Sequence, residues 1–348
     1  MNSSNFWNDQ NTSYCFQYVD NSCPKSFKPL SVIPPLLLFM FGAIILTILG
    51  NLMVIISVLY FKQLHSPTNF LILSLAIADF LLGLLVMPYS MVRSVTSCWY
   101  FGELYCKLHS CLDMILSTSS IFHLFFISVD RYYAVCQPLL YYRNITTNII
   151  ETFLLISWVL PCLYSVGLFF SNVHVEGLED NMASISCVGS CFILLNKLWG
   201  TISSLLSFYI PGNLIIFIYI HIFSIAKKLS KITPNYPSSK NENPNSKMKL
   251  VLTIETKAAK TLSIVMGTFM LCWLPFSLVA LVDPYLKYAT PSDVYDVVLW
   301  LGYFNSTLNP IIYAFFYPWF KKSLLLIITG NIFRQDLSSM VLTKRVRS

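Results

Sequence analysis

Charged side chains are scarce in this sequence: Asp, Glu, Lys and Arg make up 11% of its 348 residues, while 55% are hydrophobic. A typical soluble domain carries about 25% charged residues. The mean hydropathy is +0.63. A buried core does not account for such an apolar excess, whereas a surface that faces lipid does. The composition therefore excludes the two soluble domains that the length alone would suggest.

Motifs for catalysis are also missing. The sequence has no His/Glu set with metal-ligand spacing, no nucleophile elbow and no phosphate-binding loop, and His109, His123 and His221 are scattered. It has neither inverted repeats nor charges spread along a translocation path, which argues against a transporter or channel. We therefore expect no enzyme, no metal centre and no nucleic-acid partner.

Seven apolar stretches are present, each long enough to cross about 30 Å of hydrocarbon as an α-helix. They are Ile33–Tyr60, Thr68–Val92, Leu104–Cys136, Ile149–Phe170, Lys197–Ile225, Thr256–Val282 and Val294–Tyr317. Prolines inside several of them are tolerated in a membrane bundle, where neighbouring helices satisfy the freed carbonyls. The expected fold is an all-α, seven-transmembrane helix bundle over residues 33–317, with an N-terminal tail of residues 1–32 and a C-terminal segment of residues 318–348.

The basic residues orient the bundle. With the N-terminus outside, the inner side holds 17 Lys and Arg against 5 acidic residues, and the outer side holds 6 against 9. Basic residues concentrate on the cytoplasmic side of membrane proteins. We therefore expect an extracellular N-terminus, with glycosylation at the Asn2 and Asn11 sequons. The polar first 32 residues do not resemble a secretory signal, so the first helix is expected to direct its own insertion.

Six of the ten cysteines lie on this outer, oxidising side, where disulfides persist: Cys15, Cys23, Cys98, Cys106, Cys187 and Cys191. Cys106, at the outer end of the third stretch, could bond to the loop that carries Cys187 and Cys191. Such a bridge would hold the loop over the bundle. The spacing alone leaves the pairing open.

Asp113 falls inside a predicted span, where an ionisable side chain costs roughly 3 kcal/mol. It lies about 10 Å below the outer surface, and no other helix offers a basic residue at a matching depth. A ligand ammonium group would be a strong partner for this carboxylate. Polar packing against a neighbouring Tyr is the alternative. Cation–π attraction could come from aromatic residues near the same depth, which are Trp273, Phe276, Trp300 and Tyr303.

Ser203 and Ser207 are one helical turn apart and share a face of the fifth helix. Their hydroxyls could hydrogen-bond the polar end of a ligand. Alternatively, they bond to backbone carbonyls four residues back, as serines in membrane helices do.

Residue spacing relates the depths of Asp113 and Trp273 to the inner face of the bundle. Asp113 and Arg131 are 18 residues apart, as are Glu255 and Trp273, which corresponds to about 27 Å of helix. The third and sixth helices run antiparallel. An Arg131–Glu255 contact at the inner face would therefore place Asp113 level with Trp273 near the outer face. A cation site and an ion pair at opposite ends of two helices suit a ligand-driven switch.

Asp79 is the second acidic residue inside the predicted spans. Polar residues that could surround it are Ser120, Asn305, Ser306 and Asn309. Oxygen ligands around one carboxylate favour a small hard cation, for which we expect sodium. A proton or a cluster of waters is the alternative.

Seven landmarks in order resemble the rhodopsin-like G-protein-coupled receptors across the whole chain. They are Asn51, Asp79 within LSLAIADF, Asp130-Arg131-Tyr132, Trp158, Pro211, CWLPF at 272–276, and Asn309-Pro310-Ile311-Ile312-Tyr313. Within that family, several segments resemble the trace amine-associated receptors: FKQLHSPTNFLILSLAIADF, SCWYFGELYCKLHSC, KAAKTLSIVMG and WLGYFNSTLNPIIYAFFYPWF.

The resemblance implies a Cys106–Cys191 disulfide and a second bridge from Cys187 to the tail, with Cys23 preferred over Cys15 as its partner. It also implies an amphipathic eighth helix that starts at Tyr317–Leu326. By position, Asp113 would pair with a ligand amine and Tyr303 would support it, while Trp273 would be the activation toggle.

The full ligand set expected is Asp113, Ser117, Phe192, Ser203, Ser207, Trp273, Phe276, Trp300 and Tyr303. The activation switch expected is Asp130, Arg131, Tyr132, Glu255, Asn309, Pro310 and Tyr313.

The function expected is a plasma-membrane receptor for small monoamines, biogenic or volatile. The family resemblance implies a stimulatory G protein that raises cyclic AMP, and a role in olfaction. Ser203 replaces an acid that some family members carry, which favours monoamines over diamines. Helix 7 has no Lys, so a retinal Schiff base is excluded. A receptor of the same fold for a non-amine ligand is the alternative, and an allosteric sodium ion is the one cofactor considered.

Overall fold

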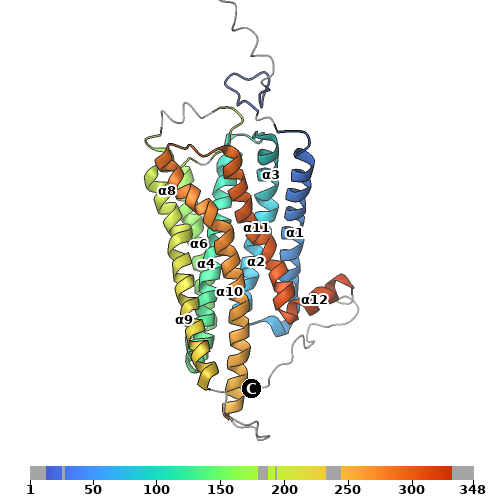
Figure 1. Cartoon of the computed structure of the whole chain (residues 1–348), viewed down its shortest axis with the longest axis vertical. Coiled ribbons are helices and arrows are strands. Elements are labelled where there is room, and N and C mark those ends of the chain that lie inside the picture. The colour runs from blue at the N-terminus through green and yellow to red at the C-terminus, as the bar shows by residue number, and fades with distance from the viewer. Residues whose placement is uncertain (1–12, 26–27, 179–186, 193, 233–243, 331–348) are drawn as a thin grey trace, which may run out of the picture.

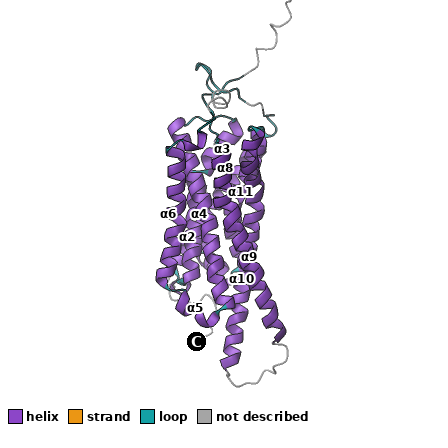
Figure 2. Ribbon diagram, turned by 90° about the vertical axis from the view of Figure 1, so that its left-hand side faces the viewer, coloured by secondary structure: helices purple, strands orange, loops and turns teal. Residues whose placement is uncertain are grey.

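The computed structural model describes residues 13–25, 28–178, 187–192, 194–232 and 244–330. These residues form a bundle of long helices that run roughly parallel or antiparallel (Figure 1). No strand is drawn in the described part of the chain when the bundle is turned by 90° (Figure 2). The fold class predicted from the sequence, an all-α membrane bundle, is confirmed.

The helix bounds follow the apolar stretches closely. The helices that build the membrane spans are α1 (Ile33–Tyr60), α2 (Pro67–Leu85), α3 (Met87–Thr96), α4 (Glu103–Cys136), α6 (Thr147–Phe170), α8 (Lys197–Ser204), α9 (Ile210–Ile232), α10 (Pro244–Val282) and α11 (Ser292–Phe316). Shorter elements are α5 (Pro138–Asn144), α12 (Pro318–Ile328), the π-helical turn Leu205–Tyr209 and the 3-10 turns Lys62–Leu64, Val173–Val175 and Asp283–Leu286.

Six of the described spans are long and apolar enough to cross a membrane individually, counting α2 with α3 and α8 with α9. The seventh, α11, meets that test together with Trp319–Ile328, to which it is joined by a bend of 103°. Figure 1 shows α12 turning away from the inner end of α11. Trp319 and Phe320 are buried whereas Leu325 is 63% exposed, as an amphipathic helix along a membrane surface requires.

Prolines explain two irregular spans. Pro88 lies in the first turn of α3, just after the second span breaks at Val86. Pro211 follows the π-helical turn of the fifth span. Proline lacks an N–H and clashes with the preceding turn, so it ends or distorts a helix.

The interior of the bundle combines an apolar core with buried polar side chains, and its outer surface is apolar. Asn51, Asp79 and Asn309 are fully buried, whereas Leu38 and Leu271 are 75% and 73% exposed. In water this arrangement would leave large apolar surfaces unfavourably hydrated, but in a bilayer they face acyl chains. The lipid-facing surface is therefore the physical reason for the low charge content.

Candidate functional site

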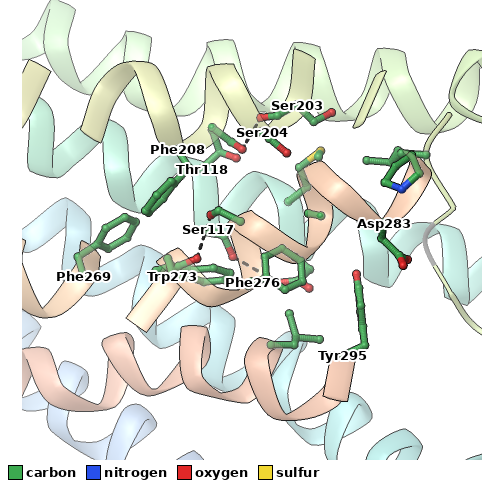
Figure 3. A pocket seen from close by; sticks show the side chains of 18 of the residues that line it. Ser117, Thr118, Ser203, Ser204, Phe208, Phe269, Trp273, Phe276, Asp283 and Tyr295 are labelled. Atoms are coloured by element: carbon green, nitrogen blue, oxygen red, sulfur yellow. Dashed lines mark hydrogen bonds between the residues drawn. The ribbon is translucent and has the colours of Figure 1, made fainter. Parts of the chain in front are cut away.

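The outer half of the bundle contains a cavity of about 120 Å³. Figure 3 shows how side chains from several helices point into it. Its lining residues are Asp113, Met114, Ser117, Thr118, Leu195, Ser203, Ser204, Ser207, Phe208, Phe269, Trp273, Phe276, Ser277, Ala280, Asp283, Pro284, Tyr288, Tyr295 and Leu299. We refer to it as the amine cavity, after the ligand that the sequence predicts. It includes six of the nine predicted ligand residues.

Asp113 is buried in the wall of this cavity. The Tyr303 hydroxyl donates to its Oδ2 at 2.7 Å and the Ser117 hydroxyl to its Oδ1 at 3.3 Å. Tyr303 comes from α11 and is itself fully buried, so it supports the carboxylate from behind rather than lining the cavity. The two hydroxyls are neutral, so a cation is the partner that would compensate the charge of this carboxylate.

The sequence predicted no basic residue at the depth of Asp113, and the structure buries a cation, Arg93, beside the Cys191 carbonyl toward the outer end of the bundle. Arg93, near the end of α3, is buried and close enough for its charge to act on Asp113. The second apolar stretch ends at Val92, but the helix continues to Thr96 and draws Arg93 into the bundle. Arg93 pairs with Asp296 at 3.5 Å instead, so Asp113 has no ion-pair partner among the described side chains.

The two helix-5 serines differ in what they offer a ligand. The Ser207 hydroxyl donates to the Ser203 carbonyl at 2.5 Å, which is the backbone bond considered for it. The Ser203 hydroxyl lies 2.6 Å from the Tyr164 hydroxyl. Both serines line the cavity, yet each hydroxyl already has a protein partner.

Aromatic rings close the inner end of the cavity. Phe208 and Phe269 stack at 6.5 Å between centroids, and Phe269 lies 6.3 Å from Trp273. Trp273 meets both Phe276 and Tyr303 edge-on, at 5.7 and 6.3 Å. Trp273, the predicted activation toggle, therefore contacts Tyr303, which donates a hydrogen bond to Asp113.

The outer end of the cavity carries a second carboxylate, Asp283. Its Oδ1 accepts hydrogen bonds from the Thr290 amide and hydroxyl at 3.0 and 2.6 Å. Burial and the charge of Asp283 raise the pKa of the neighbouring Tyr288, which stays protonated. The cavity wall thus contains two acidic residues and no Lys or Arg among the side chains described, so its electrostatic potential favours cations.

Helical periodicity could have revealed several lining residues that were missed. Phe269, Ser277 and Ala280 lie three or four positions from Trp273 or Phe276 and so share their face of α10. On α4, Met114 lies three positions before Ser117 and four before Thr118, so it shares a face with both. The loop residues Leu195 and Tyr288 carry no comparable pattern.

Two predicted ligand residues lie elsewhere. Phe192 is 47% exposed and is not part of the cavity wall. Its neighbour Cys191 is held by the disulfide to Cys106 in the first turn of α4. Trp300 lines a different cavity, between α1 and α11. Its Nε1 donates to the Ser94 hydroxyl at 3.1 Å, so the rotation of α11 directs this ring away from the amine cavity.

Three disulfides hold the outer surface together. Cys106 is bonded to Cys191 and Cys23 to Cys187, which are the two pairings that the resemblance implied. A third joins Cys15 to Cys98 and was not foreseen. The Cys23 amide donates to the Val188 carbonyl and the Val188 amide to the Asn21 carbonyl, which also attaches the tail to the loop. The tail therefore forms part of the outer surface. Asn2 and Asn11 lie outside the described residues.

A polar cluster surrounds Asp79 in the middle of the bundle. Its Oδ1 accepts hydrogen bonds from Ser306 at 2.7 Å and Ser120 at 3.3 Å, and its Oδ2 accepts one from Asn309 at 2.8 Å. Asn305 is buried but makes no hydrogen bond to Asp79 in the described structure. The oxygens of Asp79, Ser120 and Ser306 form a donor set that fits a small hard cation.

At the inner face, Arg131 is held by Asp130 beside it on α4 and by Thr68 of α2. Its Nε donates to Asp130 at 2.9 Å, and its Nη2 donates to both Asp130 and Thr68. The Tyr141 hydroxyl donates to Asp130 at 2.9 Å. Burial and the charge of Asp130 raise the pKa of Tyr141, which keeps this donor protonated. The Glu255 side chain lies outside the described residues, so the Arg131–Glu255 contact stays a prediction.

The remaining predicted switch residues lie near the inner end. Tyr132 is half-buried, with its ring 5.6 Å from His221. Tyr313 is buried with its ring 5.7 Å from Tyr317. Pro310 packs so closely against Gly50 that a Cβ there would lie 2.7 Å from the proline ring.

A seven-helix membrane bundle with a buried carboxylate in an outer cavity and an arginine network at its inner face defines a transmembrane receptor. The sequence matches the family model described as 7 transmembrane receptor (rhodopsin family) over residues 50–313. It is 55% identical to Trace amine-associated receptor 4 of Rattus norvegicus over 339 residues, 97% of this chain and 98% of the relative.

Other relatives match over a similar share of both chains. Trace amine-associated receptor 13c of Danio rerio is 48% identical over 330 residues, 94% of this chain and 96% of the relative. Trace amine-associated receptor 2 of Homo sapiens is 45% identical over 334 residues, 96% and 93% respectively. The chain therefore belongs to the rhodopsin family of seven-transmembrane receptors and, within it, to the trace amine-associated receptors. This is a family of multi-pass membrane receptors that couple to G proteins, not of enzymes.

Proposed function

We propose that the chain is a plasma-membrane receptor for small monoamines, biogenic or volatile. The observation that carries the proposal is the buried Asp113 carboxylate, which lines an acidic cavity and has only hydroxyl partners. An ammonium group supplies both the charge and the donors that this carboxylate lacks. The small cavity volume and the nearby Trp273 and Phe276 rings favour a compact ligand whose ammonium group gains roughly 0.5–2 kcal/mol from cation–π attraction.

Ligand binding then shifts an equilibrium between two arrangements of the bundle. An amine bound at Asp113 also meets Trp273, and through it α10. A ligand stabilises whichever state it binds more tightly. In the state that it favours, α10 swings outward at its inner end and Arg131 becomes accessible to a helix of the G protein. We propose the stimulatory G protein and a rise in cyclic AMP, as the resemblance implies, with olfactory neurons as the site of action.

The orientation proposed has the N-terminus outside the cell and the C-terminus inside. Disulfides persist in oxidising compartments, and the tail takes part in two of them. The excess of basic residues on the opposite side supports the same orientation. A sodium ion is proposed as an allosteric ligand, with Asp79, Ser120 and Ser306 as the residues that would hold it.

The test is a cyclic AMP reporter assay on cells that express the receptor, with a panel of primary, secondary and tertiary monoamines. Asp113→Asn keeps the shape of the side chain and removes its charge. A charge-assisted hydrogen bond contributes about 1.5–3 kcal/mol, so the amine concentration for half-maximal response should rise at least tenfold at equal surface expression. Glu103→Gln is the matched control, because Glu103 is an exposed acid on the same side.

If Asp113→Asn responds as well as the wild type, Asp113 has a structural role and the proposal fails. A non-amine agonist that is insensitive to this substitution would establish the alternative ligand class within the same fold.

A further inference from the structure

A second cavity, of about 330 Å³, lies between the outer parts of α1 and α11. We refer to it as the lateral cavity. Its apolar wall is formed by Leu36, Phe39, Met40, Val297, Trp300, Leu301 and Phe304. On α11, Tyr295 and Leu299 line the amine cavity, whereas Val297 and Leu301 line this one. At 100° per residue, these pairs lie on opposite faces of the helix.

The lateral cavity opens toward lipid. Phe39 and Val297, on its rim, are 57% and 69% exposed, and both belong to membrane-spanning helices. Val297 is five residues from the start of α11, or about 7 Å below its outer end. The molecules that reach this cavity are therefore those of the outer part of the bilayer.

The outer end of the lateral cavity is polar, and its positive and negative side chains are paired with one another. Lys28 Nζ lies 3.4 Å from Asp293 Oδ1 and donates to the Ser94 carbonyl. Asp296 is paired with Arg93 at 3.5 Å. Each cation at this end thus has a carboxylate partner within the protein, and no uncompensated positive charge faces the cavity among the described side chains.

We propose that the lateral cavity binds a sterol. A single hydroxyl both donates and accepts hydrogen bonds, so it can donate to Asp293 and accept from Lys28 without breaking their ion pair. Every glycerophospholipid carries a phosphate directly beside the glycerol that joins its chains. That phosphate would lie next to Asp293 and Asp296, where both available cations are already paired. A neutral, mostly apolar molecule with a small head satisfies the cavity better.

The lateral cavity is connected to the amine site through Trp300. The Trp300 ring meets Tyr303 edge-on at 5.6 Å, and Tyr303 donates to Asp113 at 2.7 Å. A sterol packed against Trp300 would restrict this ring and steady the Tyr303–Asp113 bond. It should therefore raise amine affinity and, by linkage, an amine should raise sterol affinity by the same factor. This second step rests on the proposed amine function, whereas sterol binding itself does not.

The direct test is photolabelling of the purified full-length receptor in phosphatidylcholine nanodiscs with a photoreactive cholesterol analogue. Labelled peptides should contain residues 36–40 or 297–304, and unlabelled cholesterol should compete. Val297→Trp and Leu301→Trp fill the cavity and should each reduce this labelling about tenfold. Val166→Trp is the matched control, because Val166 is a lipid-facing valine of α6, 42% exposed. Thermal unfolding curves confirm that each variant is folded.

Labelling that is spread over all helices, or unchanged in both cavity-filling variants, overturns the proposal. A photoreactive phosphatidylcholine that labels the same peptides and resists cholesterol also overturns it, in favour of a phospholipid site.

The coupling is tested by amine binding in nanodiscs with and without cholesterol. We expect amine affinity to rise about fivefold with cholesterol in the wild type, and this gain to disappear in Trp300→Phe while photolabelling persists. Photolabelling without any effect on amine affinity would reject the coupling but keep the sterol site. Failure of all amines to bind, with photolabelling intact, would count against the proposed function alone.

Discussion

Gly302 of α11 lies against the indole ring of Trp273 of α10. A Cβ on Gly302 would come within 2.8 Å of two carbon atoms of that ring, far inside contact distance. Trp273 also lines the amine cavity and meets Phe276 and Tyr303 edge-on. The missing side chain at position 302 therefore lets the two helices approach and fixes where the indole lies.

This contact makes Gly302→Ala a sharp test of Trp273. The added methyl group must displace the indole or push α10 and α11 apart, and such overpacking costs about 1–3 kcal/mol. We expect the substitution to change basal cyclic AMP signalling and to weaken the amine response. Gly267→Ala is the matched control on α10, because its Cβ meets nothing within 4 Å. If both variants signal like the wild type, the packing of Trp273 does not control activation.

The Asp79 cluster predicts a specific stabilisation by sodium. A ligand that binds only the folded state stabilises it in proportion to the logarithm of its concentration. The unfolding temperature of the purified receptor should rise with sodium chloride but not with N-methylglucamine chloride at equal ionic strength. Asp79→Asn should remove the difference. A rise that persists in Asp79→Asn would place any sodium effect elsewhere.

The Cys15–Cys98 disulfide predicts that the tail stabilises the receptor. It joins residues that are 83 positions apart in the sequence, and disulfides that close long loops contribute about 2–4 kcal/mol. The double variant Cys15→Ser, Cys98→Ser should unfold at a lower temperature than the wild type. Equal melting curves for the two proteins, with the disulfide verified by mass spectrometry, would contradict this expectation. The double variant avoids leaving one reactive thiol that could pair with Cys23.

His174, in the loop after α6, predicts a pH dependence of stability. It is buried, its ring packs on Phe169 at 5.2 Å, and its Nδ1 lies 3.0 Å from the Leu168 carbonyl. Burial, with a contribution from Lys107, lowers the pKa of His174 below its usual 6.5. The unfolded chain therefore takes up this proton first as the pH falls. His174 should contribute its full stability above pH 6.5 and lose it progressively below.

Melting curves at a series of pH values between neutral and mildly acidic check this expectation. The fall in melting temperature should be smaller in His174→Gln, which has no titrating ring. An identical fall in both proteins would assign the pH dependence to other groups.

The spans and the ligand carboxylate were predictable because lipid imposes strong rules on sequence. An apolar run of the right length has few alternatives to a membrane helix, and Asp113 stands out because a charge there is costly. Other features depend on packing that periodicity does not determine. Trp300 is only three positions from Tyr303, yet faces α3 and α1, because the rotation of α11 is set by its neighbours.

Arg93 and the third disulfide were missed for related reasons. Arg93 follows the apolar run, and only the structure shows that the helix continues and buries it. The Cys15–Cys98 pairing depends on where a polar tail folds, for which the sequence carries no repeating signal.

The pairing of the tail cysteines has a consequence for biosynthesis. Cys187 is made 164 residues after its partner Cys23, whereas Cys98 follows Cys15 by only 83. At about 5–20 residues per second, the interval for Cys23 is on the order of ten to thirty seconds. During that time Cys15, Cys23 and Cys98 all reach the compartment where thiols oxidise, in the proposed orientation. During synthesis, Cys23 can therefore form a non-native disulfide with Cys15 or Cys98 before its native partner Cys187 has been made. Oxidoreductases that reshuffle such bonds become part of what this receptor needs to mature.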